Sequence, residues 1–376
     1  MPKTGENIYK RKDGRWEGRY LKGRKPSGKA LYGYVYAYSY KDVKKKLSAA
    51  VAGNHAPART GASGITFSEM AEQWLRSQQA RVKASTYNKY HNLLQSYILP
   101  YIGTVYLKEL NAACVTDLCD VLLSCGGHQG NGLSEKTVAD TLSVIRCVIQ
   151  YAATMGHSCA FDAKSVRVRQ QVRQLRIISP RDQQTLYSYL TARPSPYNIG
   201  ILICLLTGLR IGEVCALCWE DISFTDHTMY IHKTVQRIQF PGASGPKTGV
   251  IVTSPKSVCG KRTIPLPENL ETLLRDMDTA KTGFVLSRNG VQVTEPRVLQ
   301  YHFKKILKEI GIEEVNFHAL RHTFATRCVE IGFDVKSLSE ILGHSSISIT
   351  MNKYVHPSMR VKHENMQRLS SLFAVK

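Results

Sequence analysis

The sequence lacks long hydrophobic runs. In this chain of 376 residues the best apolar run, 199–206, has eight residues and includes Gly200, whereas a membrane-spanning helix needs about 18 or more. The first residues, MPKTGENIYKRK, contain no apolar segment of a secretory signal. We therefore expect a protein of the cytoplasm with no membrane partner.

The ten cysteines lack the spacing of a zinc site. Cys215 and Cys218 form one CxxC, but neither a second pair nor suitably spaced histidines accompany it. Without a secretory signal, these thiols are expected to be reduced. A helix buried in the core explains the pair better than a metal or redox site, so no metal is expected.

Acidic residues are few. The 29 Asp and Glu residues stand against 51 Lys and Arg residues, which gives a net charge of +22. Such an excess indicates a polyanionic partner, most often nucleic acid. Residues 1–60 alone hold 15 basic residues and four acids, so the excess is concentrated in the first sixth of the chain.

Residues 1–55 are expected to form a three-stranded sheet followed by a helix. Asp13-Gly14 lies between two extended runs, which is a strong hairpin signal, and 30–39 and 41–50 predict a third strand and a short helix. A two-stranded ribbon fits the DNA major groove, so we favour nucleic-acid contact over a merely solvated basic face. The candidate DNA-binding residues are Arg11, Arg15, Arg19, Lys22 and Arg24.

A linker rich in Gly, Ala and Pro, 53–64, precedes a helical domain over 65–160. Thr66 and Glu69 form a capping box ahead of an amphipathic helical pattern. About four helices are expected: one from 67, one from 87 to a stop at Pro100 and Gly103, one over 115–123, and one over 138–152 capped by Ser134.

A second linker, 164–181, contains six basic residues and no acid, which suits a strap along a phosphate backbone. Its candidate DNA-binding residues are Lys164, Arg167, Arg169, Arg173 and Arg176. A third domain over 179–376 has a mixed pattern, with helices, then β-rich runs within 228–266, then helices again.

The third domain contains a set of cationic, imidazole and phenolic side chains. His318 and Arg321 are three residues apart and share a helix face. Lys256 is expected at the mouth of a hairpin tipped by Cys259-Gly260. Lys247 and Lys261 are the alternative lysines for the same role. His322 is expected to face elsewhere and to be structural. The candidate residues are Arg210, Glu213, Lys256, His318, Arg321, His344 and Tyr354.

Three segments, TGLRIGEVCALCWEDI, HALRHTFATR and LGHSSISITMNKYVH, resemble the motif blocks of the tyrosine recombinase, or phage integrase, family. The chain is most similar to integrases of conjugative transposons and phages. The resemblance implies a mainly α fold with small β-sheets (α+β): an arm-type DNA-binding domain with a three-stranded sheet plus helix, a helical core-binding domain, and a mixed α/β catalytic domain.

The resemblance implies a site-specific recombinase that cleaves and rejoins DNA through a 3′-phosphotyrosyl intermediate, so that a mobile element is integrated and excised. Arginine forks suit a phosphodiester because they stay charged and bond phosphate oxygens bidentately. Arg210 and Arg321 would hold the non-bridging oxygens and Tyr354 would attack phosphorus. Ionising a free tyrosine at pH 7 costs roughly 4 kcal/mol, and His318 is the better candidate to accept its proton.

The remaining roles follow from the same resemblance. Lys256 would protonate the leaving oxygen, His344 would bond the phosphate, and Glu213 would orient the active-site groups. No cofactor is expected, because the covalent link keeps the energy of the broken bond.

The expected partners are double-stranded DNA at core and arm sites and three further copies of the chain. A final amphipathic helix over 358–376 is expected to dock on a neighbouring protomer, with docking on its own catalytic domain as the alternative. Accessory DNA-bending proteins are possible partners. When bound to DNA the protein would lie on the nucleoid.

Two other functions fit parts of the pattern. Residues 335–354 resemble a helix-turn-helix with Gly343 at the turn, as in a DNA-binding regulator, but this leaves Arg210 and Lys256 unexplained. A type IB-like topoisomerase would use the same phosphotyrosine chemistry without arm-binding or docking segments.

Overall fold

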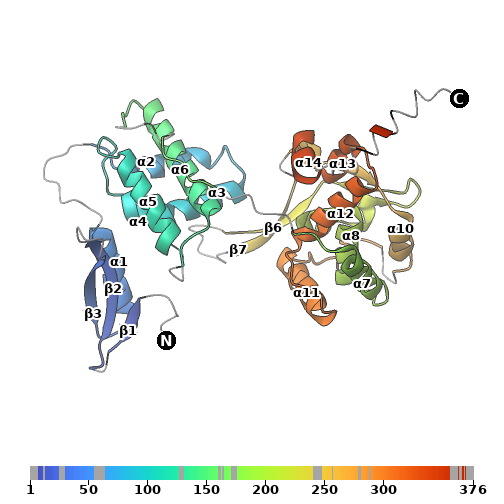
Figure 1. Cartoon of the computed structure of the whole chain (residues 1–376), viewed down its shortest axis with the longest axis horizontal. Coiled ribbons are helices and arrows are strands. Elements are labelled where there is room, and N and C mark those ends of the chain that lie inside the picture. Colours follow the sequence, from blue (N-terminus) through green and yellow to red (C-terminus); the bar gives the residue numbers. More distant parts are fainter. Residues whose placement is uncertain are drawn as a thin grey trace. The chain divides into compact units, whose positions relative to one another are not determined.

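The computed structural model describes residues 7–11, 13–24, 30–54, 64–126, 131–159, 162, 165–170, 176–239, 248–255, 257–277, 281–287 and 289–355, and the single residues 363, 366, 367 and 369. The chain forms two compact units, Met1–Val172 and Arg173–Lys376 (Figure 1). None of the helices in the described ranges combines the length and the apolarity needed to cross a membrane.

The first unit begins with an antiparallel sheet in the order β1-β2-β3, formed by Ile8–Lys10, Trp16–Arg24 and Ala30–Ala37. The predicted turn at Asp13-Gly14 is confirmed, and Gly14 has a φ of +84°, which favours glycine. Helix α1 (Tyr40–Asn54) packs on one face of the sheet (Figure 1). The other face exposes a row of tyrosines: Tyr32, Tyr34 and Tyr36.

The rest of this unit is helical, with α2 (Phe67–Gln78), α3 (Ala84–Leu93), α4 (Leu99–Ile102), α5 (Ala112–Cys125) and α6 (Glu135–Thr154). The capping box at Thr66 and Glu69 and the cap at Ser134 are confirmed. The predicted stop is confirmed at Gly103, which follows the last residue of α4, and wrong at Pro100: a π turn, Leu94–Ile98, joins α3 to α4 and places Pro100 in a first helical turn, where proline is tolerated.

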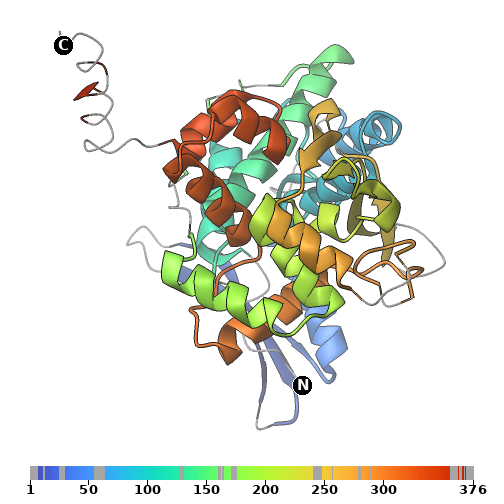
Figure 2. The ribbon, with the colours of Figure 1, turned by 90° about the vertical axis from the view of Figure 1, so that its right-hand side faces the viewer.

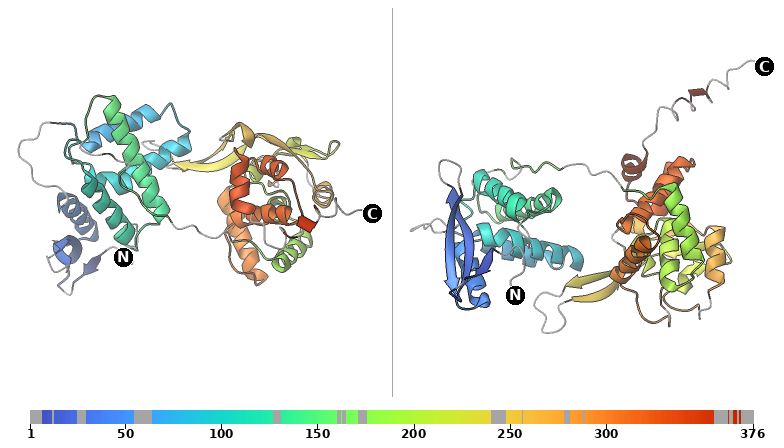
Figure 3. Two further views of the ribbon diagram at one scale, coloured as in Figure 1. Left: turned by 45° about the horizontal axis from the view of Figure 1, so that its top comes forward. Right: turned by 60° about the horizontal axis from the view of Figure 1, so that its bottom comes forward.

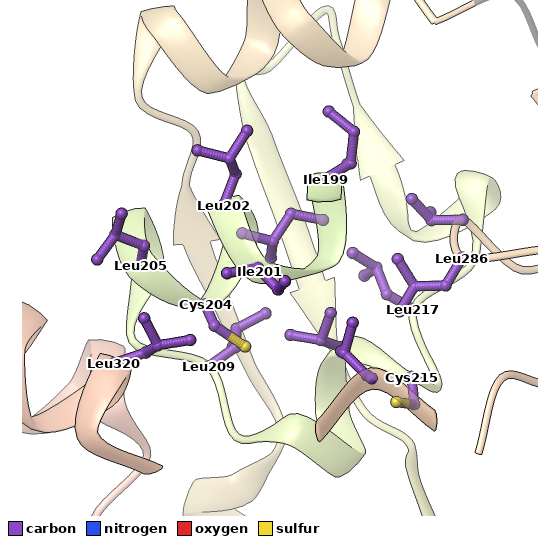
Figure 4. Close-up of a cluster of buried hydrophobic side chains, with 14 of the residues drawn as sticks. Ile199, Ile201, Leu202, Cys204, Leu205, Leu209, Cys215, Leu217, Leu286 and Leu320 are labelled. Atoms are coloured by element: carbon purple, nitrogen blue, oxygen red, sulfur yellow. The ribbon is translucent and has the colours of Figure 1, made fainter. Parts of the chain in front are cut away.

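The second unit is built around α8 (Pro196–Thr207), whose side chains are buried almost all round. Figure 4 shows Ile199, Leu202 and Leu205 of this helix within the apolar core. The helices that surround the core are α7 (Pro180–Thr191), α9 (Ile211–Val214), α10 (Glu268–Arg275), α11 (Pro296–Glu309), α12 (His318–Glu330), α13 (Val335–Leu342) and α14 (Ile347–Tyr354). Cys215 and Cys218 are buried free thiols, but they follow α9 instead of lying within a helix.

Two small sheets complete this unit. Strands β4 (Ile222–Ser223), β5 (Thr228–Ile231) and β8 (Arg262–Pro265) form one, and β6 (Thr234–Gln239) and β7 (Thr248–Thr253) form a separate ribbon (Figure 3). The predicted hairpin tipped by Cys259-Gly260 is therefore wrong, because β7 pairs with β6 whereas β8 pairs with β5. Burial of Met229, Ile231 and Ile264 in the core explains the β5–β8 pairing.

The predicted fold class, mainly α with small β-sheets, is confirmed by this architecture. Helices α12, α13 and α14 contact one another, and α13 and α14, in red, lie together at one end of the second unit (Figures 1 and 2). Among the described residues, the candidate side chains of this unit are carried by α12, by α14, by the connection between α13 and α14, which holds His344, and by the start of α9.

Candidate active site

The C-terminal end of α13 gathers three arginine side chains. Its consecutive carbonyl groups at Ile341, Leu342 and Gly343 accept hydrogen bonds from three different guanidinium groups, those of Arg262 at 2.5 Å, Arg321 at 2.7 Å and Arg210 at 3.2 Å, respectively. The last carbonyls of a helix have no partner within it and form its negative end. The helix end thus provides fitting acceptors for positively charged groups.

Gly343 makes this convergence possible. It ends α13 in the left-handed conformation, with a φ of +64°. A Cβ atom at this position would lie 2.8 Å from Nη1 of Arg262 and 2.9 Å from the carbonyl oxygen of Cys259. Any other residue would therefore be strained and would displace the guanidinium group.

Glu213 joins two of the arginines. Its carboxylate is 3% exposed and accepts bonds from Arg210 Nη1 at 2.7 Å and Arg262 Nη2 at 2.9 Å. Although burial raises the pKa of Glu213, the Arg262 and Arg210 guanidinium groups hold that pKa below its ordinary value. Among the described residues of this cluster, three guanidinium groups surround one carboxylate, which leaves an excess of positive charge for an anionic ligand.

Arg321 is the most deeply buried of the three, with 2% exposure. Its Nη1 donates to the carbonyl oxygen of Gly208 at 2.9 Å, at the end of α8. Burial, followed by the charge of Arg210, lowers the pKa of Arg321 to about 9. The guanidinium group therefore remains charged at neutral pH.

Tyr354 lies beside this arginine cluster, within the same chain. This last residue of α14 is 6% exposed. Burial raises its pKa, while the nearby charges of Arg321 and Arg210 and a hydrogen bond with Arg321 oppose the shift. The phenol is thus within electrostatic reach of both arginines that the sequence nominated.

Two histidines, His322 and His344, lie beside the phenol, and His318 packs against His322. The ring of His344 is parallel to that of Tyr354, with centroids 6.5 Å apart, and its Nδ1 lies 2.8 Å from the buried Thr350 hydroxyl. His318 stands edge-on to His322, with centroids 4.5 Å apart. Burial and neighbouring cations lower the pKa of His322 to about 4 and that of His344 to about 3. Both imidazoles are therefore neutral at pH 7.

The expectation that His322 faces elsewhere is wrong, because its Nδ1 lies 2.7 Å from the Tyr354 hydroxyl. Residues four apart share a helix face, so His322 lies beside His318. Arg262 was missed altogether. The sequence did contain one signal for it. Arg262 stands two residues before the apolar Ile264, and residues two apart in a strand point to the same face, which for Ile264 is the buried one.

Other predicted residues lie outside this cluster. Arg11, Arg167, Arg169 and Arg176 are exposed and Arg15 is partly exposed, and Arg176 pairs with Glu313 at 3.3 Å. Arg19 lies over the ring of Tyr32, with its guanidinium carbon 4.5 Å from the ring centroid. For Lys22 and Arg24 the structure describes the strand backbone only. Lys164, Arg173, Lys247, Lys256 and most of 358–376 lie outside the described residues.

A buried phenol beside clustered guanidinium groups and neutral histidines is the arrangement of an enzyme that attacks a phosphate ester. The sequence model of the Phage integrase family matches residues 170–360, and that of the phage integrase N-terminal SAM-like domain matches residues 66–122. The chain belongs to the phage integrase family. The predicted identity, a tyrosine-type site-specific recombinase, is confirmed.

Two curated relatives illustrate the similarity. A "Tyrosine recombinase XerC-like" protein of Caldanaerobacter subterraneus subsp. tengcongensis is 23% identical over 376 aligned residues, covering 93% of this chain and 94% of that protein. The transposase from transposon Tn916 of Enterococcus faecalis is 27% identical over 187 residues, covering 45% and 44%.

Two solved structures share the fold. The Tn1549 transposon integrase in complex with transposon right-end DNA has a TM-score of 0.67 at 20% identity, covering 81% of this chain and 100% of that one. A lambda integrase tetramer bound to a Holliday junction has a TM-score of 0.60 at 15% identity, covering 94% and 98%.

Proposed function

We propose that Tyr354 attacks a DNA phosphodiester held by Arg210 and Arg321 and forms a 3′-phosphotyrosyl link. The observation that supports this most directly is the position of the Tyr354 phenol beside the arginine cluster at the end of α13. Preorganised cations stabilise the charge that develops on the phosphate oxygens in the transition state. Arg262 serves this site indirectly, by neutralising Glu213 and fixing the position of Arg210.

The neighbouring groups complete the chemistry. His344, held by Thr350, donates a hydrogen bond to a non-bridging oxygen, and His318, exposed at the start of α12, lies where the phosphate enters. Lys256 protonates the leaving 5′-oxygen. The covalent link conserves the energy of the broken ester, so a second strand's 5′-hydroxyl reseals the DNA without ATP.

The substrate is double-stranded DNA, bound by three domains over 1–55, 65–160 and 179–376. The helical and catalytic domains bind the core site, and the basic linker 164–181 follows the phosphate backbone. The N-terminal sheet binds arm sites through its exposed arginines. With DNA as substrate, the protein works on the nucleoid in the cytoplasm.

Four copies of the chain act together, because two duplexes must each be cut on both strands. The tetrameric state of lambda integrase on a Holliday junction supports this assembly. Residues 358–376 link neighbouring protomers. Deleting them should reduce cooperative assembly on DNA, as measured by gel mobility; unchanged assembly would rule out this role of the tail.

The decisive test is covalent capture on a nicked suicide duplex. The full chain should form a protein–DNA adduct that is lost in Tyr354→Phe. Absence of an adduct would favour a DNA-binding regulator. Strand exchange between two duplexes then separates a recombinase from a topoisomerase, which relaxes supercoils without exchanging partners.

A further inference from the structure

The hydroxyl group of Tyr354 has a specific partner. It lies 2.7 Å from Nδ1 of His322, within the 2.6–3.2 Å range typical of a general base and the proton it abstracts. His322 is 8% exposed, whereas His318, one turn earlier on α12, is exposed. The buried histidine of the pair contacts the nucleophile, and the exposed one is open to solvent.

The groups that face His322 decide its protonation state. Lys353 from α14 and Arg321 from α12 are positively charged, and His318 packs edge-on against the ring. Burial, followed by these cations, lowers the pKa of His322 to about 4. A neutral imidazole has one donor and one acceptor nitrogen. The proposal below requires the tautomer in which Nδ1 accepts from the Tyr354 hydroxyl and Nε2 carries the ring proton.

We propose that His322, in place of the His318 expected from the sequence, is the general base that removes the proton of Tyr354 during strand cleavage and returns it during ligation. This inference rests on the proposed attack by Tyr354. The proton passes from the phenol oxygen to Nδ1 as the oxygen–phosphorus bond forms and the bond to the 5′-oxygen breaks. The leaving oxygen takes a separate proton from the general acid, assigned above to Lys256.

Substrate binding strengthens this base. A phosphodiester held by Arg210 and Arg321 brings negative charge to a site in which burial and neighbouring cations keep His322 neutral. A nearby anion favours the protonated form of an imidazole, so the pKa of His322 rises when DNA is in place. Tyr354 is therefore activated mainly in the complex, and not in the free protein.

The substrate for the test is selected with the wild-type chain. A library of random-sequence nicked duplexes is incubated with the protein, and the duplexes recovered covalently on Tyr354 are sequenced and used in every further measurement. If the wild-type chain captures none, the proposed function fails, whatever the role of His322. If capture occurs, the role of His322 is tested separately.

The variants are His322→Gln and, as matched control on the same helix face, His318→Gln. At pH 7, cleavage by His322→Gln should be about 10²–10⁴-fold slower than wild type. Its rate should rise about tenfold per pH unit between about pH 6 and pH 9, because solvent must now ionise the phenol. Wild type and His318→Gln should be nearly independent of pH over this range. A wild-type pH profile in His322→Gln, or the tenfold slope in His318→Gln, would overturn the proposal.

A modified duplex separates the two proton transfers. With sulfur in place of the scissile 5′-oxygen, the leaving thiolate needs no proton. His322→Gln should remain impaired on this substrate, whereas Lys256→Ala should recover. Recovery of His322→Gln would place His322 on the leaving-group side and refute its role as base.

A second measurement avoids the His322 variant in case that variant does not fold. Nitrogen-15 NMR of histidine-labelled full-length protein should give an unprotonated Nδ1 for His322. Its resonance should shift in Tyr354→Phe, which removes the donating hydroxyl. A protonated Nδ1 in the wild-type chain would contradict the proposal.

Discussion

The candidate active site and the N-terminal sheet both present arginines, but they hold them in opposite ways. In the candidate site, the side chains of Arg262 and Arg321 are buried, and each donates to backbone carbonyl groups from distant parts of the chain. On the sheet, Arg11 and Arg15 are more than 40% exposed and pair with Glu17 and Asp13, close by in sequence. The first set is fixed before any ligand arrives, and the second is free to rearrange.

This difference suits the buried arginines to the reaction and the exposed arginines to DNA binding. A transition state is stabilised by charges that are already in place, which requires the buried scaffold at the end of α13. Exposed ion pairs contribute only about 0–1 kcal/mol, so an arginine on the sheet exchanges its acid partner for a phosphate at little cost. Each prediction below tests one side of this contrast.

Arg262→Met should cause the largest loss. It leaves the 3% exposed Glu213 carboxylate with one guanidinium partner instead of two. Breaking a buried ion pair costs about 3–5 kcal/mol, and cleavage should fall as well, because Arg210 loses its fixed position. Urea unfolding of the full chain measures the stability. Lys261→Met, the exposed neighbour, is the control, and an equal loss there would contradict the scaffold role of Arg262.

Arg210→Ala should reduce cleavage by at least about 10²–10³-fold, the cost of removing one preorganised donor. Duplex affinity should change little, because many other cations contact the backbone. Rates of adduct formation and Kd values on the captured duplex measure the two effects. Arg169 is an exposed linker residue. Arg169→Ala should weaken duplex binding and leave the cleavage rate of bound duplex nearly unchanged. Parallel losses of binding and cleavage in Arg210→Ala would remove the distinction between the two arginine sets.

Short sequence patterns predicted much of the fold. They did not predict how strands that are distant in the sequence pair with one another. The capping box at Thr66 and the Asp13-Gly14 turn depend on a few adjacent residues, so they are visible in the sequence. Motif order brought Arg210, Arg321 and Tyr354 together correctly. Other features depend on residues far apart in the chain.

Two failures illustrate the second point. The pairing of β8 with β5 depends on burial of Ile231 and Ile264, which no local pattern near Cys259 reveals. Arg262 bonds a carboxylate 49 residues earlier in the chain. Its alternation with Ile264 places it on the inward face of the strand, but nothing near it in the sequence identifies Glu213 as its partner. The role of such residues becomes visible only when the core that aligns them is known.

The candidate site should also be the more acid-sensitive region. The pKa values of His322 and His344 lie near 4 and 3 in the folded chain, below the ordinary value of about 6.5. Between these values the unfolded chain binds more protons, so the free energy of unfolding falls as pH drops below about 6.5. Glu213, whose pKa is also lowered, adds to the loss below about pH 4.3.

Urea unfolding at about pH 7.5 and pH 5 should therefore differ by up to about 4 kcal/mol, with about 2 kcal/mol from each histidine. His344→Asn, which cannot titrate, should make this difference smaller. Peptide-resolved hydrogen exchange should show the acid-induced opening in 316–354 before it appears in 8–37. The contrast would be wrong if both segments opened together as the pH falls.

The smallest effect is expected on the N-terminal sheet. Arg15 pairs with Asp13 at 2.8 Å and lies over the Tyr36 ring, 5.6 Å from its centroid. If it contacts one phosphate, Arg15→Ala should weaken duplex binding by no more than about 1 kcal/mol and make the slope of log K against log salt shallower by about 0.9. Cleavage of bound duplex should be unchanged. Asp13→Asn, which frees Arg15, should instead strengthen binding. A change in cleavage rate in either variant would mean that the sheet acts on the chemistry and not on affinity alone.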